Sequence, residues 1–394
     1  MNTESVISNE IKDAFFAVIA DTVFGGERSA TTLSELAEDK LLSLYAIAKK
    51  HDLAHLLIDT LAKNATSISP ALIEKLQKQK MMAIYRSQRI AHEQERILRV
   101  LESEKIPHIA LKGAVIRNLY PEPWMRTSCD IDILVPPERL EDAVSALTQM
   151  LGYKTDGKRY FHDIHLYSEN GVHLELHFSI LEDAENLDKL LKEAWSHATP
   201  ICPNRFEYKF SPEFFILHLI AHASYHFASG GCGLRILLDL CILRQRFDFD
   251  ELRVRSLCAE CGIERFYIAL CQLADLRFSN APKTELSERL ENFIIGGGTY
   301  GTKENAIAVG KIKKGGKLKY ILSRIFLPYA SLSILYPSLK KHKWLFPFFQ
   351  LRRWVSIIFS KRLRSSVKEL QYATTLSSEK NDEVSALLKE LELK

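Results

Sequence analysis

The feature that most constrains the fold is the alternation of polar and apolar residues between positions 128 and 178. It occurs in three segments, 128–135, 161–167 and 172–178, and a turn signal, Asn170-Gly171, separates the last two. Successive side chains of a strand point to opposite faces of its sheet, so this alternation predicts strands with one buried and one polar face. The chain is therefore predicted to contain a β-sheet as well as helices.

The rest of the sequence has apolar residues mainly at helical spacing, and the whole chain is predicted to have an α+β fold. The clearest helix begins at Ser69-Pro70, where the serine can cap the helix and the proline fits its first turn, and it runs to about Glu104. The predicted regions are a helical region over 1–104, a core with the strands over 105–205, a helical domain over 206–295 and a helical module over 296–394.

The composition is that of an ordinary globular protein, with 394 residues of which 46% are apolar and 26% charged. An odd number of cysteines, seven, is scattered along the chain, and the N-terminus carries acids where a secretory signal would be basic. We therefore expect a cytoplasmic protein with free thiols. The sequence contains no uncharged apolar window of 18 residues, so no membrane-spanning helix is expected.

Charge is distributed unevenly along the chain. The net charge is +4, but residues 311–370 contain 15 Lys and Arg and one acid, Glu369, so this segment alone carries +14 and the other 334 residues carry −10. The same segment contains ten aromatic residues. This mixture suits an anionic membrane surface at the inner face of the membrane, or a phosphate-rich partner. The alternative is a helical module whose basic face is simply solvated.

Asp130 and Asp132 are the first candidates for chemistry, because alternation places both on the polar face of one strand. Carboxylates about 6.6–7 Å apart repel by roughly 2–2.5 kcal/mol at an effective dielectric of about 20. A cation between them would relieve this repulsion, and hard divalent ions such as Mg²⁺ prefer oxygen ligands. The alternative is that both aspartates face water.

The hairpin that follows supplies a third carboxylate, Glu175. A two-residue turn at 170–171 would mix its polar and apolar faces, whereas a three-residue loop with Gly171 in the left-handed region pairs His165 with Glu175. We therefore predict the three-residue, bulged loop. The polar face of the hairpin would then carry Glu175, flanked by histidines, towards the two aspartates.

Two further segments are candidates for binding a nucleotide. An apolar strand runs into a turn at Lys112-Gly113 and then a helix over 115–120, which places backbone N–H groups where a phosphate could bind; the alternative is a plain helix start. His218, His222 and His226 form one stripe of a later helix, and zinc there would need a carboxylate partner. We expect the stripe to line a cleft with Arg235 and Asp239; the alternative is an i, i+4 ion pair between these two and buried histidines.

The order of these segments resembles the DNA polymerase β-like nucleotidyltransferase superfamily. Residues 111–120, 126–135 and 172–178 are similar to a bacterial family of uncharacterised nucleotidyltransferases, and the looser resemblance extends to residues 218–226, 234–240, 298–301 and 336–339. The resemblance implies a core of a small mixed sheet with helices, embedded between helical regions. The superfamily's turn is usually Gly-Gly or Gly-Ser, and this chain departs from it with Ala114 after Gly113.

The resemblance also implies a role for each candidate residue. Asp130 and Asp132 would bind a divalent metal, Mg²⁺ or Mn²⁺, and Glu175 would bind metal or activate the acceptor hydroxyl. The triphosphate would lie over the turn of Lys112 and Gly113. An arginine four residues before the first aspartate is typical of the antibiotic-modifying branch of the superfamily, and Arg126 occupies that position. Lys112 and Arg126 are therefore candidates for binding the leaving pyrophosphate.

The implied reaction is attack of an acceptor hydroxyl on the α-phosphorus of a nucleoside triphosphate such as ATP, with release of pyrophosphate. The acceptor would be a small molecule or related to a glycan, and no specific nucleic acid is expected as a partner. Three alternatives remain open: a catalytically silent nucleotide-binding or antitoxin-like regulatory protein, a transferase that adds AMP to proteins, and a zinc-dependent hydrolase.

Overall fold

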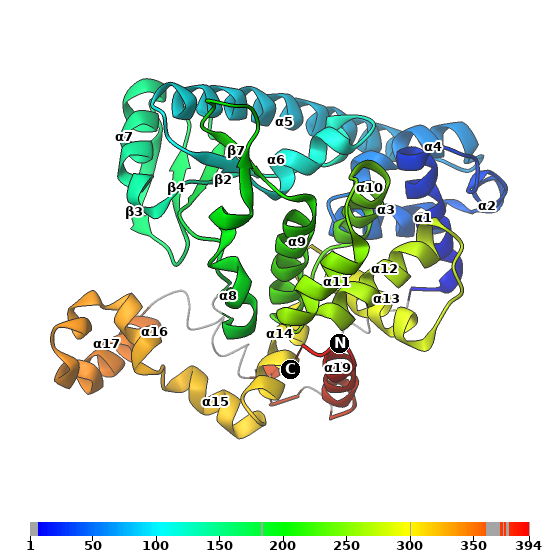
Figure 1. The fold of residues 1–394 in the computed structure, drawn as a ribbon. Helices are drawn as coiled ribbons and strands as arrows, with labels where there is room; N and C mark the ends of the chain where they lie inside the picture. The colour runs from blue at the N-terminus through cyan, green and yellow to red at the C-terminus, as the bar shows by residue number, and fades with distance from the viewer. Residues whose placement is uncertain are drawn as a thin grey trace.

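The computed structural model describes residues 7–182, 184–299, 301–359, 371–372, 374–375 and 378–393. These residues form an α+β fold in which one mixed sheet lies beside a larger assembly of helices (Figure 1). The helices are α1 (Asn9–Phe24), α2 (Ala30–Glu35), α3 (Glu38–Lys50), α4 (Ile58–Asn64), α5 (Pro70–Ser103), α6 (Lys112–Ile116), α7 (Leu140–Leu151), α8 (Glu185–Leu191), α9 (Pro212–Phe227), α10 (Arg235–Arg246), α11 (Glu251–Glu260), α12 (Glu264–Phe278), α13 (Glu285–Gly297), α14 (Lys303–Lys313), α15 (Lys317–Ile325), α16 (Tyr329–Leu335), α17 (Phe346–Ile358) and α19 (Ser378–Glu390).

The sheet has seven strands in the order β3-β4-β5-β2-β1-β7-β6. Two neighbouring pairs, β2–β5 and β1–β7, are parallel, and the other pairs are antiparallel. The strands are β1 (His108–Ala110), β2 (Asp130–Leu134), β3 (Lys154–Arg159), β4 (Asp163–Tyr167), β5 (His173–His177), β6 (Ala198–Pro200) and β7 (Glu207–Phe210).

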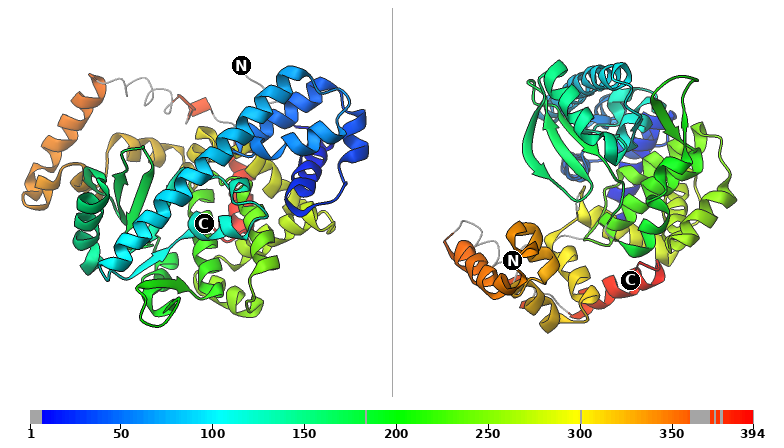
Figure 2. Two further views of the ribbon diagram at one scale, coloured as in Figure 1. Left: turned by 90° about the horizontal axis from the view of Figure 1, so that it is seen from above. Right: turned by 60° about the vertical axis from the view of Figure 1, so that its left-hand side comes forward.

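Helix α5 connects the sheet to the helical assembly. It begins where the sequence predicts, with the Ser69 side chain accepting a hydrogen bond from the N–H of Leu72 and Pro70 in the first turn. Its length lets it run from the N-terminal helices to the sheet (Figure 2, left). There Ile97 and Leu101 pack with Ile131 and Ile133 of β2 in one buried apolar cluster that also includes α7.

A larger apolar core fills the helical assembly. It contains buried residues of α1, α3 and α4, of α9 to α13, and of α19 near the C-terminal end of the chain. The core also includes Ile109, Leu111 and Leu134, so it draws on all four of the predicted regions. Helix α19 packs against α13 and α14. The division of the chain into domains at residues 104, 205 and 295 stays a prediction.

The hairpin has the predicted register. His165 pairs with Glu175 and Ile164 pairs with Leu176, and Gly171 has a φ of +72°. A left-handed residue at this position lets the three-residue loop close without mixing the two faces of the strands. The prediction of a bulged loop is therefore confirmed.

Other local features differ from the sequence prediction. The helix after the Lys-Gly turn begins at Lys112 rather than Val115, and it continues as a 3₁₀ turn over Arg117–Leu119. Strands β3, β6 and β7 were not predicted. Every residue of β3 is exposed, so it lacks the apolar alternation that reveals a half-buried strand, and β6 and β7 are too short for a pattern.

The C-terminal part described by the structure, α15 to α17, extends away from the sheet and the main helical assembly (Figure 1). It has a small apolar cluster of its own, in which Leu332, Leu339 and Phe349 are buried. None of the helices formed by the described residues is both long enough and apolar enough to cross a lipid bilayer.

Candidate active site

The three predicted carboxylates lie on the same face of two adjacent parallel strands. Asp130 and Asp132 are on β2, and Asp132 is the direct register partner of Glu175 on β5. The next strand, β4, places His165 opposite Glu175 on the other side. The sheet therefore brings Asp132 and Glu175 together, although 42 residues of chain lie between them.

Asp132 is buried and surrounded by positive charge. Its Oδ1 lies 3.1 Å from Nε2 of His177 and 4.0 Å from Nζ of Lys112. Burial by itself would raise the pKa of Asp132, but Lys112 and His177 outweigh it and hold the pKa well below its usual range. This carboxylate is therefore ionised at neutral pH.

Asp130 responds to the same surroundings in the opposite direction. Burial, followed by the negative charges of Asp132 and Glu175, raises the pKa of Asp130 to about 6. Three carboxylates close enough to repel one another form a site that a cation would stabilise, as the sequence predicts.

The polar atoms at the site fit a divalent cation. Ligand atoms of Asp132, Glu175 and His177 all lie within 4.8 Å of one another. Burial alone would lower the pKa of His177, but its hydrogen bonds to Asp132 and Glu175 raise it to about 9. The protonated imidazole thus supplies the positive charge that an ion would otherwise bring. Two carboxylates, with Asp130 beside them, provide the oxygen donors that Mg²⁺ and Mn²⁺ prefer.

The Lys-Gly turn lies directly beside these acids. Nζ of Lys112 is 3.4 Å from Nε2 of His222, so its side chain reaches between the acidic strand β2 and helix α9. Gly113 also makes a contact that the sequence did not predict. A Cβ at this position would lie 2.6 Å from Nη1 of Arg126, so the absent side chain admits a guanidinium, where the sequence suggested a phosphate.

Arg126 and Asp239 form a buried ion pair. Nε and Nη2 of Arg126 donate hydrogen bonds to the two carboxylate oxygens of Asp239 at 2.9 and 2.8 Å, and the hydroxyl of Tyr120 donates to the same carboxylate. Both charged side chains are almost fully buried. In this conformation the carboxylate of Asp239 takes up two of the three guanidinium nitrogens that could otherwise bind pyrophosphate.

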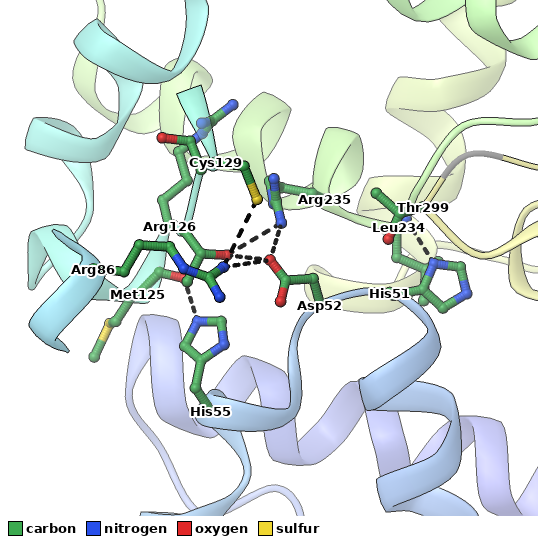
Figure 3. A network of polar contacts seen from close by, with 12 residues as sticks. His51, Asp52, His55, Arg86, Met125, Arg126, Cys129, Leu234, Arg235 and Thr299 are labelled. Carbon is green, nitrogen blue, oxygen red and sulfur yellow. Dashed lines mark hydrogen bonds and ion pairs between the residues drawn. The ribbon is translucent and has the colours of Figure 1, made fainter. Parts of the chain in front are cut away.

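Arg235 has a different partner from the one considered in the sequence. The alternative of an i, i+4 pair between Arg235 and Asp239 is wrong, because Nη2 of Arg235 bonds to Oδ2 of Asp52 at 3.1 Å and to Oγ1 of Thr127 at 3.2 Å. Figure 3 shows Asp52 between Arg235 and Arg86, whose Nη1 lies 3.8 Å from the same oxygen. The N-terminal helices are thus tied to the chain just ahead of β2.

A cavity of about 180 Å³ lies between α9 and α10, and one of its lining residues, His222, contacts Lys112. The structure brings together at this cavity His222, Arg235 and Asp239, as the sequence suggests, and His226 as well. His218 is buried one turn away, in a small gap of about 10 Å³ that Lys112 and His177 also line. The cavity is therefore connected to Asp132 through His222 and Lys112.

One family model, described as "Uncharacterised nucleotidyltransferase", matches residues 38–279. This match spans more than half of the chain. The chain belongs to this nucleotidyltransferase family. No curated protein and no solved structure matches the chain. The matched segment contains the whole sheet, the three acids, the Lys-Gly turn and all but one of the residues that line the cavity. The protein thus belongs to the nucleotidyltransferases, a family that implies a nucleoside triphosphate as the substrate.

Glu182, which the sequence did not single out, orients His222 at the candidate site. Oε1 of Glu182 lies 2.8 Å from Nδ1 of His222 and accepts its proton in a hydrogen bond. Burial would raise the pKa of Glu182, but the bond to His222 lowers it to about 2. With Nδ1 protonated, Nε2 of His222 accepts from Lys112 and from His226. No motif surrounds Glu182, so no sequence signal could have revealed it.

Arg117 and His177 were within reach of sequence reasoning. Nε of Arg117 donates to the carbonyl of Gly113 at 2.8 Å, and Nη2 donates to Oγ of Ser128 at 3.0 Å, so this buried guanidinium holds the turn against β2. Burial and the neighbouring Arg126 lower the pKa of Arg117 to about 10. His177 lies on the polar face already predicted for β5, and alternation is the signal that finds it.

Proposed function

We propose that this enzyme transfers a nucleoside monophosphate from the triphosphate to a hydroxyl acceptor, with divalent ions held by Asp130, Asp132 and Glu175. The observation that carries the proposal is the pairing of Asp132 with Glu175 on adjacent parallel strands. Their carboxylates are near enough to share an ion. We also propose that the core is of the polymerase β-like type, because β1, the Lys-Gly turn with α6, and the acidic strand β2 follow one another in that order along the chain.

Each residue of the site has a proposed role in the reaction. A bound Mg²⁺ or Mn²⁺ would supply charge stabilisation at the reacting phosphate. Asp132 stays ionised to hold the ion, and Lys112 lies where it can meet the phosphates. Glu175 is partly exposed and accepts the proton of the acceptor hydroxyl. The acceptor oxygen then bonds to the α-phosphorus while the bond to the leaving pyrophosphate breaks.

The acceptor is proposed to bind in the cavity lined by His222, His226 and Arg235. Its volume of about 180 Å³ is small beside the roughly 300–1,000 Å³ of pockets for drug-sized ligands. A small molecule or a single unit of a glycan fits this size better than a folded protein does. The guanidinium of Arg235 would donate hydrogen bonds to hydroxyl or anionic groups.

One observation favours a second candidate, a nucleotide-binding or antitoxin-like protein without turnover. Arg126 and Arg235 are both bonded to carboxylates, Asp239 and Asp52, which reduces the positive charge available to a triphosphate. Transfer of AMP to a protein is a third candidate, and it shares the same metal chemistry. The experiment below separates all three.

The test measures pyrophosphate release with Mg²⁺ or Mn²⁺, each of the four common NTPs, and a small-molecule extract as the source of acceptors. We expect release by the wild type and a fall of more than about 100-fold in Asp132→Asn, because the ion loses a ligand. Asp142→Asn, on the exposed face of α7, is the matched control and should keep full activity. Binding of NTP without pyrophosphate release would establish the silent alternative, and a gain of one AMP in intact mass would establish protein modification.

We also propose that α15 and α17 bind an anionic membrane surface, which would place the enzyme at the inner, cytoplasmic face of the membrane. Along α15, Leu318, Leu322 and Ile325 form an exposed apolar stripe, and α17 has a longer one. The exposed apolar residues of α17 and its C-terminal end are Phe348, Leu351, Val355, Ile358 and Phe359. Apolar stripes beside many Lys and Arg suit insertion among negatively charged headgroups. Residues 360–370 of the basic segment lie outside the described residues.

Flotation with vesicles tests this proposal. We expect the protein to float with vesicles that contain phosphatidylserine or another anionic lipid, and to float less as salt rises. Leu318→Glu with Leu322→Glu should reduce the floating fraction at least about tenfold. Leu42→Glu places one such charge on a leucine of α3 that is about as exposed as Leu322, and it should not reduce flotation. Equal flotation of all three proteins, or flotation of none, would contradict the proposal.

A further inference from the structure

We propose that the chain holds a second cation, bound by His165, His173 and Glu175, and that this ion is a transition metal of the zinc class. The proposal goes beyond nucleotidyl transfer, and ion binding at these residues does not depend on it. The three side chains lie on the polar face of β4 and β5, next to the three-carboxylate site, and Glu175 is common to both.

The register of the hairpin creates this group. His165 on β4 is the direct partner of Glu175 on β5, and His173 precedes Glu175 by two residues, which places it on the same face. Nε2 of His165 lies 4.0 Å from Oε1 of Glu175, and the two imidazole rings are 4.7 Å apart between centroids. Ligand atoms of all three residues lie within 4.8 Å of one another.

The types of donor select the ion. Two imidazole nitrogens and one carboxylate oxygen form a set that suits Zn²⁺, Co²⁺ or Ni²⁺. Mg²⁺ and Ca²⁺ prefer oxygen and are rarely bound by imidazole. The neighbouring group of Asp130, Asp132 and Glu175 has the opposite preference, so two ions of different class would lie on either side of one glutamate.

Several polar atoms on this face lack the partner that an ion or its bound water would supply. The structure has eight buried side-chain polar atoms without a hydrogen bond among its described residues. His173 Nε2, which belongs to the proposed group, is one of the eight, and Asp163 Oδ1 and His177 Nδ1 lie further along the same face. Buried polar groups in proteins are nearly always satisfied, so their concentration here points to an unseen ligand.

Asp163 lies beside His165, two residues away along β4. Its Oδ1 lies 3.3 Å from Nε2 of His165, without the alignment of a hydrogen bond. Ligands about 2.0–2.1 Å from a tetrahedral zinc ion are separated by roughly 3.3 Å. The spacing of these two atoms therefore already matches a pair of ligands on one ion.

Aromatic neighbours hold the two imidazoles in place. The ring of Tyr160 stacks on His165 with centroids 4.2 Å apart, and Tyr167 stacks on His173 with centroids 4.8 Å apart. Stacked rings have fewer rotamers available, so less entropy is lost when the ion binds. The side chains of His165 and Glu175 are about one-fifth to one-quarter exposed, which leaves a path for an ion from solvent.

The test uses the full-length, untagged chain, stripped with a chelator and titrated with Co²⁺ in the presence of excess Mg²⁺. We expect one Co²⁺ per chain with the visible absorption of a four-coordinate site, and its displacement by Zn²⁺. His165→Ala and His173→Ala should each weaken binding by more than about 100-fold. His92→Ala, an exposed histidine on α5, is the matched control and should bind as the wild type does.

A further variant separates the two ion sites. Asp132→Asn should retain the Co²⁺ spectrum, because Asp132 is not among the proposed ligands. Loss of the spectrum in this variant, no binding by the wild type, or binding unaffected by His165→Ala and His173→Ala would each overturn the proposal. Thermal melting of every variant, with His173→Gln as a milder change, shows whether a loss reflects unfolding. A chain that binds Co²⁺ as expected but releases no pyrophosphate would contradict the proposed function alone.

Discussion

Arg126 lies four residues before the first aspartate, and it also joins the Lys-Gly turn to α10. Its guanidinium is buried, bonded through two nitrogens to Asp239, and packed by its third nitrogen against Gly113 of the Lys-Gly turn. The turn and the acidic strand are thereby held to α10. We expect substitutions at either end of this contact to reduce stability.

The first prediction concerns Gly113→Ala. The new Cβ would lie 2.6 Å from Nη1 of Arg126, and because Asp239 holds the guanidinium it cannot move away easily. We expect the free energy of unfolding to fall by about 1–3 kcal/mol, as for other overpacked sites. Urea denaturation measures it. Gly296→Ala in α13 meets no atom within 4 Å and should be neutral or slightly stabilising; an equal loss in both variants would contradict the role assigned to Arg126.

The second prediction concerns Asp239→Ala. This change leaves the buried Arg126 without its partner and removes the acceptor for Tyr120. Breaking a buried pair typically lowers the free energy of unfolding by about 3–5 kcal/mol. Asp142→Ala removes the partner of Arg139 in an exposed pair and should lower it by less than about 1 kcal/mol. Similar losses for the two variants, measured by denaturation, would show that the buried pair contributes little.

At the scale of elements, His51 joins three helices. It follows α3, its Nδ1 accepts the N–H of Leu234 at the start of α10, and its Nε2 donates to the carbonyl of Ile295 in α13 (Figure 3). Both nitrogens are used by the neutral ring. Burial lowers the pKa of His51 to about 4, despite the opposing effect of the Ile295 carbonyl.

This arrangement leads to a prediction about pH. The folded-state pKa of about 4 lies below the ordinary 6.5, so below pH 6.5 the unfolded chain binds a proton that the folded chain refuses. The stability present above pH 6.5 is therefore lost as pH falls towards 4, by up to about 3 kcal/mol from this group. We expect His51→Gln to flatten the decline between pH 6.5 and 4.5 in urea denaturation. His92→Gln, exposed on α5, should leave it unchanged.

Strands β2, β4 and β5 could be predicted from the sequence, whereas β3, β6 and β7 could not. Alternation of polar and apolar residues is a local signal, and the strands that carry the acids have it in their sequences, although β2 is buried on both faces in the structure. An exposed strand such as β3 is stabilised by its pairing with β4, and a sequence does not display that partner. The candidate site was predictable for the same reason as its strands.

At the scale of the whole molecule, α19 ties the C-terminal part of the chain to the main core. Val384, Leu387, Leu388 and Leu391 are buried in the same cluster as residues of α1 and α9. The intervening helices α15 and α17, by contrast, expose many large apolar side chains. The basic segment 311–370 is therefore flanked on both sides by helices, α14 and α19, that pack on the main core.

The fourth prediction compares two leucines of this region. Leu388→Ala creates a cavity in the main core and should lower the free energy of unfolding by about 2–5 kcal/mol. Leu318→Ala, on the exposed stripe of α15, should change it by less than about 0.5 kcal/mol. Calorimetry or denaturation of the full chain measures both. A small effect of Leu388→Ala would mean that α19 is not part of the cooperative core.

The sequence by itself determined the polar face of the acidic strands, the bulged hairpin and the residue types that can hold a divalent ion. These follow from alternation and turn chemistry, which act over a few neighbouring residues. Only the tertiary structure decided which polar partners meet: Asp239 with Arg126, Asp52 with Arg235, and Glu182 with His222. In each pair the partners lie at least 40 residues apart, and no local pattern specifies which of several charged residues the packing of helices brings within reach.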